Sequence, residues 1–237
     1  MPSKRNEQGQ TLEEFLKSYD PTIYKNPAVC VDMAVFSVSE STLKPTVLLI
    51  KRRNHPFIGE YALPGGFVEI DEEVEAAAKR ELFEEASIQL DKMYEYGSFG
   101  RLGRDPRTRI ISIAHLGIVP MGAFSPKAGD DASDARVFTL NFTRDNNICL
   151  ITLCDGENTL KLSLETENDD YFNLPIKIKR VYESSLASDH SEILLKGLQH
   201  LCLMNRDTLI KQLKPPVNMQ ERLREALNIL AEQVLGS

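Results

Sequence analysis

The chain has 237 residues, of which 42% are hydrophobic and 27% are charged, so it is neither wholly disordered nor collagen-like. Its 28 basic and 35 acidic residues give a formal net charge of −7, which argues against a general attraction to nucleic acids or anionic membranes. Its apolar runs fall short of the roughly 20 residues that span a bilayer, and its first ten residues are polar. We therefore expect a soluble, cytoplasmic protein without a membrane partner.

The N-terminal part of the chain predicts one helix followed by two strands. Thr11 and Glu14 have the spacing of a capping box and precede apolar residues, which predicts a short helix. Residues 28–38 and 46–50 are rich in apolar and β-branched side chains, which is typical of buried strands.

A tight bend and a second helix come next. Pro64 fixes its own φ angle, and the glycines at 65 and 66 permit backbone angles that other residues avoid, so residues 63–66 must turn sharply. Residues 67–70 can extend briefly. A helix is then expected from Asp71, which can act as its N-cap, to about Ala86.

The second half of the chain predicts a β-rich stretch and a helical tail. Five segments have the composition of strands, namely residues 109–119, 136–140, 148–153, 159–164 and 176–182. The region 141–187 therefore reads as a β-rich insertion, with a hairpin turn at 155–158. Asp189 and Asn218 can each open a C-terminal helix, and the second carries an apolar stripe of Leu223, Leu227, Leu230 and Val234.

The predicted helix 71–86 carries three glutamates on one face. At 100° per residue, Glu81, Glu84 and Glu85 fall within an arc of roughly 100°. One interpretation is a solvated acidic face paired with Lys79 and Arg80. The other is a partly packed face that gathers a cation, because the same stripe begins with small and apolar residues. The glycine bend can add the Gly66 carbonyl, and such hard oxygen ligands suit Mg²⁺ or Mn²⁺.

This segment resembles the Nudix box, GX5EX7REUXEEXGU, where U is a bulky aliphatic residue. Eight positions match: Gly66, Glu72, Arg80, Glu81, Leu82, Glu84, Glu85 and Ile88. Ser87 departs from the pattern, which has glycine there, and this puts the turn that ends the helix in question more than the chemistry.

The resemblance implies a Nudix-type α/β/α sandwich around a mixed sheet and a metal-dependent pyrophosphohydrolase. By the same resemblance, Glu81, Glu84 and Glu85 are metal ligands or orient water, and Arg80 holds a glutamate in place. Gly66 is expected as a further metal ligand through its carbonyl at the bend. Nudix enzymes carry the general base either on the helix or on a later loop, so Asp130 and Asp131 can supply the base, complete the metal site or cap a turn.

Two further segments are similar to those of ADP-ribose pyrophosphatases, and the resemblance covers about residues 25–140. One contains Arg104, Arg107 and Arg109, which can contact substrate phosphates or form a surface cluster with Asp105. The other is residues 128–132. His115 and His190 are expected to be packed or bonded within the fold, and three aromatic residues can stack an adenine or belong to the core: Phe57, Tyr61 and Phe99.

Two functions from different classes remain open. The favoured one is hydrolysis of ADP-ribose, a small nucleotide substrate, to AMP and ribose 5-phosphate. The alternative is a nucleotide-sensing Nudix-related transcriptional regulator. Residues 201–237 hold five basic and four acidic residues, which argues against a DNA-binding tail. A homodimer is compatible with either function. The expected divisions are an N-terminal extension (1–24), a Nudix domain with its insertion (25–200) and a C-terminal helical extension (201–237).

Overall fold

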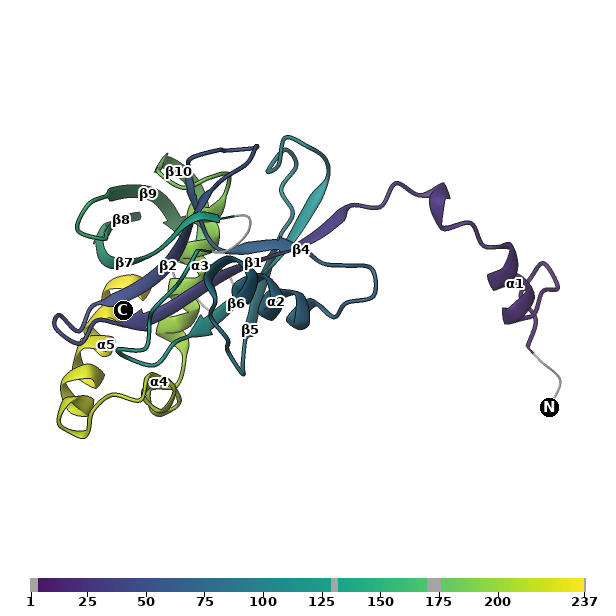
Figure 1. The fold of residues 1–237 in the computed structure, drawn as a ribbon. Helices are drawn as coiled ribbons and strands as arrows, with labels where there is room; N and C mark the ends of the chain where they lie inside the picture. Colours follow the sequence, from purple (N-terminus) through teal and green to yellow (C-terminus); the bar gives the residue numbers. More distant parts are fainter. Residues whose placement is uncertain (1–3, 129–131, 170–175, 237) are drawn as a thin grey trace.

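One ten-stranded mixed sheet organises the part of the chain that the computed structural model describes, residues 4–128, 132–169 and 176–236 (Figure 1). Its strand order is β10-β9-β8-β7-β2-β1-β6-β5, with β3 paired to β2 and β4 paired to β1. β1 (Ala28–Val38) runs parallel to β6 (Ile110–Ile118), while the other pairs of named strands are antiparallel. The remaining strands are β2 (Pro45–Arg52), β3 (Tyr61–Ala62), β4 (Gly65–Phe67), β5 (Tyr94–Phe99), β7 (Ala132–Asp145), β8 (Ile148–Cys154), β9 (Thr159–Glu167) and β10 (Lys177–Ser184).

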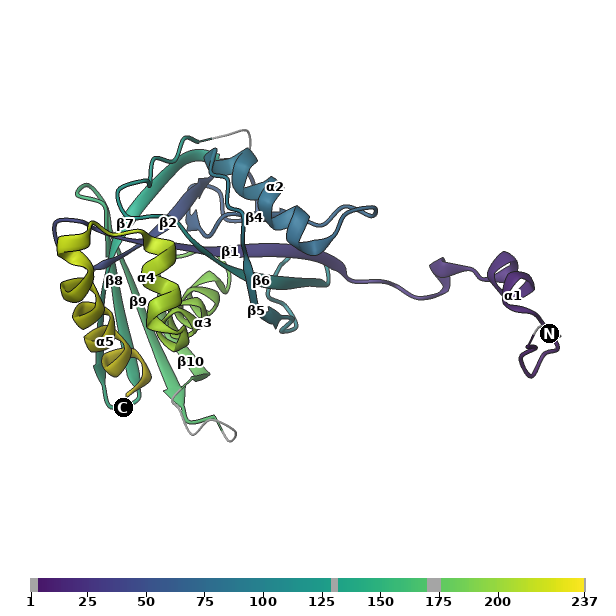
Figure 2. The same ribbon diagram turned by 90° about the horizontal axis from the view of Figure 1, so that it is seen from below.

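Helices cover both faces of this sheet (Figure 2). On one face lies α2 (Val74–Ala86), and on the other lie α3 (His190–Leu203), α4 (Arg206–Leu213) and α5 (Gln220–Leu235), with the short 3₁₀ helix η2 (Val217–Met219) before α5. Alternate side chains of β1 serve the two layers, because Met33 packs with the α2 core and Phe36 with the α3–α5 core. The predicted α/β/α sandwich around a mixed sheet is confirmed.

Most predicted elements are present. Thr11 and Glu14 make both bonds of a capping box at α1 (Leu12–Ser18), and the 3₁₀ helix η1 (Pro21–Ile23) follows. In Figures 1 and 2 this N-terminal segment lies apart from the sheet, and α1 has no buried residue. The apolar stripe of α5 is buried as predicted.

The starts of α2 and α5 differ from the prediction, since α5 has Met219 rather than Asn218 at its N-cap, whereas α3 starts at Asp189 as predicted. The N-cap of α2 is Glu73 rather than Asp71, because the residues before it are held in a loop by the bond from the Glu69 N–H to the Glu72 carboxylate. Asp189 does occupy the N-cap position of α3, but its carboxylate makes no capping bond and is bound by Arg104 instead.

Four features of the sheet and tail were not predicted. β7 has 14 residues, whereas the sequence indicated only 136–140. β5 and α4 were missed, although the Asn205 side chain caps α4 by accepting from two backbone N–H groups. β8 to β10 extend the central sheet beyond β7 as an antiparallel meander, and the division at residues 24 and 200 stays a prediction. No helix in the described ranges is long and apolar enough to cross a bilayer.

Candidate functional site

The site is built around the corner between β3 and β4, residues 63–66. The corner is bonded to three different elements. The Met33 N–H of β1 donates to the Pro64 carbonyl at 2.8 Å, and the Gly65 N–H donates to the Glu85 carboxylate of α2 at 2.8 Å. The Leu63 N–H donates to His190 Nδ1 at the start of α3 at 3.0 Å. The corner is therefore fixed against both faces of the sandwich.

The two glycines of the corner lie in close packing. A Cβ atom on Gly65 would overlap the Val31 backbone carbonyl, so only glycine lets the corner lie this close to β1. A Cβ atom on Gly66 would overlap the Glu81 carboxylate, so the Glu81 side chain would have to move aside. At the other end of α2, Ser87 adopts the left-handed conformation with φ 55° and so makes the turn for which the family pattern uses glycine.

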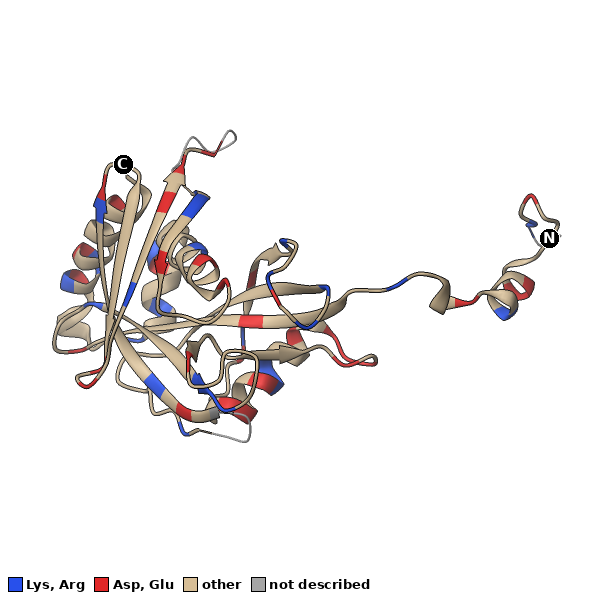
Figure 3. Ribbon diagram, turned by 90° about the horizontal axis from the view of Figure 1, so that it is seen from above, with Lys and Arg blue, Asp and Glu red and all other residues tan. Residues whose placement is uncertain are grey.

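Arg80 gathers the carboxylates of the acidic segment. Its guanidinium binds Glu72 with two bonds, at 2.9 and 2.8 Å, and contacts Glu81 at 2.7 Å and Glu84 at 3.1 Å. It also donates to the Phe67 carbonyl at 3.0 Å. Figure 3 marks the acidic residues on α2 and on the connection before it. One arginine thus ties the loop before α2 to the acidic face of the helix.

The three helix glutamates lie in different environments. Glu84 is half exposed, Glu81 is largely covered, and Glu85 is 6% exposed. Burial raises the pKa of Glu85 to about 8, with the nearby Glu81 and Asp32 adding to the rise and the Gly65 N–H and Arg52 opposing it. Burial also raises the pKa of Glu81, against the opposing effect of Arg80. A nearby cation would therefore favour the charged forms of the two covered carboxylates, Glu81 and Glu85.

The donors present fit a hard divalent cation by their chemistry. Carboxylate oxygens, together with a backbone carbonyl at Gly66, are the ligands that Mg²⁺ and Mn²⁺ prefer. In the described residues, however, no three acidic, histidine or cysteine side chains converge closely enough to hold a metal. Arg80 binds the carboxylates of both Glu81 and Glu84. These two side chains would have to leave Arg80 to bind a cation in common.

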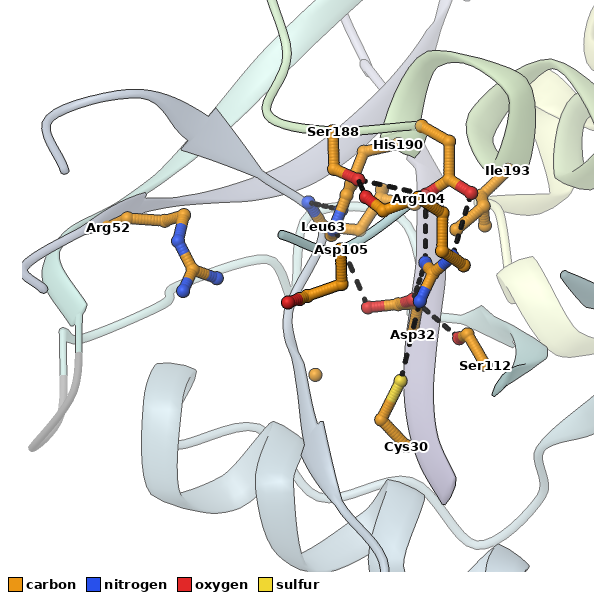
Figure 4. Close-up of polar contacts among 12 residues, drawn as sticks. Cys30, Asp32, Arg52, Leu63, Arg104, Asp105, Ser112, Ser188, His190 and Ile193 are labelled. Atoms are coloured by element: carbon orange, nitrogen blue, oxygen red, sulfur yellow. Dashed lines mark hydrogen bonds and ion pairs between the residues drawn. The ribbon is translucent and has the colours of Figure 1, made fainter. Parts of the chain in front are cut away.

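A buried polar network lies behind the corner (Figure 4). Arg104 makes two bonds of 2.8 Å to Asp189 and one of 3.3 Å to Asp32. Asp32 also accepts from the Ser112 hydroxyl at 2.5 Å, and the Ser188 hydroxyl donates to the Arg104 carbonyl. Arg104 is 7% exposed and its charge is already paired, so this network primarily joins β1, β6 and the start of α3.

The other two predicted phosphate-binding arginines lie in different places. Arg107 pairs with Asp105 at 2.8 Å, stacks on the Phe67 ring and lines a cleft beside the corner. Arg109 is exposed, donates to the Gly100 carbonyl at 2.6 Å and does not line the cleft. The structure therefore brings Arg104 and Arg107 to one cleft and leaves Arg109 outside it.

One arginine side chain that lines the cleft was not predicted from the sequence. Arg52, at the end of β2, donates its Nε to the Pro56 carbonyl at 2.8 Å and lies across the cleft from Arg104 and Asp105 in Figure 4. The cleft also includes Cys30, Phe57, Gly66 and Ser188 in its lining. Its enclosed volume of about 60 Å³ is far below the roughly 300 Å³ that encloses a small ligand, so it suits one end of a larger molecule.

The remaining predicted residues are distributed as follows. Asp130 and Asp131 lie outside the described residues. His115 is buried and bonded to the Ile113 carbonyl at 3.1 Å, and His190 is bonded within the fold, as expected. Tyr61 belongs to the core and Phe99 packs against it, whereas Phe57 lines the cleft.

Comparisons with known proteins agree with this architecture. The sequence model of the NUDIX domain family matches residues 29–148. The chain is 44% identical over 126 residues to an ADP-ribose pyrophosphatase of Methanocaldococcus jannaschii, covering 53% of this chain and 69% of the relative. It is 35% identical over 114 residues to an ADPR-responsive transcriptional repressor of Acinetobacter baylyi, covering 47% of this chain and 45% of that relative.

A solved structure is similar over nearly the whole chain. The crystal structure of a MutT/nudix family protein from Enterococcus faecalis superposes with a TM-score of 0.66 at 26% identity. The match covers 93% of this chain and 88% of the other, so the sheet extension and the C-terminal helices are shared with that protein as well.

Proposed function

This chain belongs to the Nudix family, and on that premise we propose that it hydrolyses the pyrophosphate bond of a nucleoside diphosphate derivative with a divalent cation. The preferred substrate is ADP-ribose, and the products are AMP and ribose 5-phosphate. The similarity to an ADP-ribose pyrophosphatase over the region that holds the acidic helix supports this choice.

The observation that carries the proposal is the joint placement of the corner and the acidic helix. Gly66 lies against the Glu81 carboxylate, Glu85 binds the Gly65 N–H, and Arg80 gathers Glu72, Glu81 and Glu84. These residues would hold Mg²⁺ or Mn²⁺ through the Gly66 carbonyl and the three helix carboxylates. A cation held there would neutralise pyrophosphate oxygens and lower the pKa of bound water.

The chain's own residues orient the substrate and the site. Arg80 keeps Glu72 and the helix in one unit through its fork of donors. Arg52 and Arg107 add positive charge to the cleft next to the corner, which suits the phosphate groups of the substrate. Asp130, Asp131 or one of the helix glutamates serves as the general base.

A substrate panel tests the activity. ADP-ribose and other nucleoside diphosphate derivatives are incubated with Mg²⁺ or Mn²⁺, and the products are resolved by chromatography. We expect AMP from ADP-ribose, and a loss of about a hundredfold or more in Glu84→Gln and Glu85→Gln, because each removes a charge aimed at the cation. Glu75→Gln is the matched control, since Glu75 lies on the same helix but pairs only with Lys79 in the described contacts.

A nucleotide-sensing regulator is the second candidate, because the other relative is a repressor. In that case the chain binds ADP-ribose tightly with little turnover and is retained on duplex DNA. α4 and α5 carry both basic and acidic side chains, as Figure 3 shows, which argues against a uniformly basic DNA-binding face. Turnover without retention on DNA favours the hydrolase, and retention without turnover favours the regulator.

A further inference from the structure

His190 links the C-terminal half of the chain to the corner of the proposed metal site. Its Nδ1 accepts the Leu63 N–H across 127 positions of sequence. Because Nδ1 is an acceptor, the proton of the neutral ring lies on Nε2, which faces the Asp32 carboxylate at 3.8 Å. Leu63 is 1% exposed, so water cannot readily replace the imidazole as the partner of its N–H group.

The imidazole is held on a rigid support. Asp189, the preceding residue, accepts bonds from Nε and Nη2 of Arg104, and the Ser188 hydroxyl donates to the Arg104 carbonyl. The Ala187 N–H donates to the Tyr61 carbonyl at 2.9 Å, which joins this segment to β3 just before the corner. The start of α3 therefore has little freedom to move relative to residues 61–63.

The corner receives bonds from both layers of the sandwich. His190 binds the Leu63 N–H from the α3 side, and Glu85 binds the Gly65 N–H from the α2 side. Gly66 follows at once and lies against the Glu81 carboxylate. A shift of the corner at Leu63 is thus transmitted through two residues to the groups proposed to bind the cation.

We propose that His190 is a positioning residue, whose imidazole fixes the 63–66 corner so that Gly66, Glu81 and Glu85 can bind a divalent cation in common. The expected effect on turnover rests on the proposed function, whereas the expected effect on the geometry of the corner does not. His190 also lines the cleft, but the proposed role depends on its Nδ1, which accepts from the backbone of the corner and not from a substrate.

The surroundings keep the ring neutral and hence able to accept. Burial lowers the pKa of His190. Asp32 from β1 and Asp189 from the start of α3 oppose this effect, whereas Arg104 and Arg52 reinforce it. A doubly protonated ring would turn a donor toward the Leu63 N–H and break the bond.

Three full-length variants test the proposal. His190→Leu removes the acceptor, and His190→Asn keeps an amide oxygen close to the position of Nδ1. His115→Leu is the matched control, because His115 is also buried but its ring is bonded to the Ile113 carbonyl of its own strand, β6, and makes no bond to the corner in the described contacts. Each variant is measured for hydrogen exchange of residues 61–67, for Mn²⁺ affinity, and for kcat and KM with ADP-ribose.

Loss of one buried hydrogen bond in His190→Leu should have three effects of about tenfold each. The backbone amides of the corner should exchange faster, the affinity for Mn²⁺ should fall, and kcat should fall. KM should change less than twofold. His190→Asn should recover most of all three, and His115→Leu should leave them unchanged. The proposal is overturned if folded His190→Leu retains normal exchange and Mn²⁺ affinity, or if His190→Asn is as impaired as His190→Leu. If no protein turns over ADP-ribose, the proposed function fails, while exchange and Mn²⁺ binding still decide the role of His190.

Discussion

Gly66 lies directly against the Glu81 carboxylate, in the space that a side chain at position 66 would occupy. Arg80 contacts the same carboxylate at 2.7 Å. The glycine and the arginine together define where the Glu81 side chain can lie, which explains why the acidic helix and the glycine corner form one structural unit.

Replacing Gly66 by alanine should therefore displace Glu81 and lower turnover by on the order of a hundredfold, since small misplacements of a reacting group carry penalties of that size. Mn²⁺ affinity should fall as well. Gly100→Ala is the control, because a Cβ atom there meets its neighbours at ordinary distances of 3.5 Å or more. Equal activity of the two variants would contradict the role of Gly66.

The raised pKa of Glu85 predicts a pH dependence of stability in the metal-free protein. The folded-state pKa of about 8 lies above the ordinary value of 4.5, so the folded state binds more protons than the unfolded state between these values. The contribution of Glu85 to the free energy of unfolding is thus largest below about pH 4.5 and is lost as the pH rises through about 8.

Denaturant unfolding in EDTA at pH 6 and pH 9 measures this effect as the difference between wild type and Glu85→Gln. The wild type should lose more stability than the variant between the two pH values, because glutamine cannot titrate. A variant with the same pH dependence as the wild type would show that Glu85 is not the buried titrating group.

Mutation of Arg104 and mutation of Arg109 should change the stability of the fold by different amounts. Arg104→Ala leaves Asp32 and Asp189 buried without their partner, which should destabilise the fold by about 3–5 kcal/mol. Arg109→Ala removes an exposed side chain and should change stability by less than about 0.5 kcal/mol. Thermal and denaturant unfolding compare the two, and similar losses would contradict this assignment.

Arg52 should affect substrate binding rather than folding. Arg52→Ala removes a cation from the cleft, and KM for ADP-ribose should rise by about tenfold or more, as expected for loss of a charge-assisted hydrogen bond. Steady-state kinetics measure the change, with Arg53→Ala as a neighbouring control that does not line the cleft. An unchanged KM would remove Arg52 from the proposed binding surface.

Local sequence patterns predicted the acidic helix, whereas the α/β/α sandwich was implied by the resemblance to the Nudix box. The box from Gly66 to Ile88 is continuous in sequence and occupies β4, α2 and the short segments on either side of α2, so near neighbours determine much of its geometry. Likewise, the alternating side chains of β1 and the apolar stripe of α5 carry their own periodicity.

Long-range pairing explains what the sequence did not reveal. The buried network joins three distant segments, which supply Asp32, Arg104 and Asp189. Nothing in the sequence near Asp189 indicates that its carboxylate binds an arginine and does not cap α3. Arg52 lies in a run of three basic residues that reads as an ordinary charged strand end, although its strand directs it to the cleft. Only the packed structure could identify these partners.

The exposed N-terminal segment leads to a prediction about assembly. α1 has seven residues and buries none of them, while Leu12 and Leu16 are 71% and 59% exposed. So short a helix is marginal in water unless its apolar face is covered.

We predict that this face is covered in a homodimer, and that the double variant Leu12→Ser with Leu16→Ser shifts the protein to a monomer. Light scattering coupled to size exclusion gives the mass. Val217→Ser, which alters an exposed apolar residue at η2, should leave the mass unchanged, and a wild-type monomer would refute the prediction.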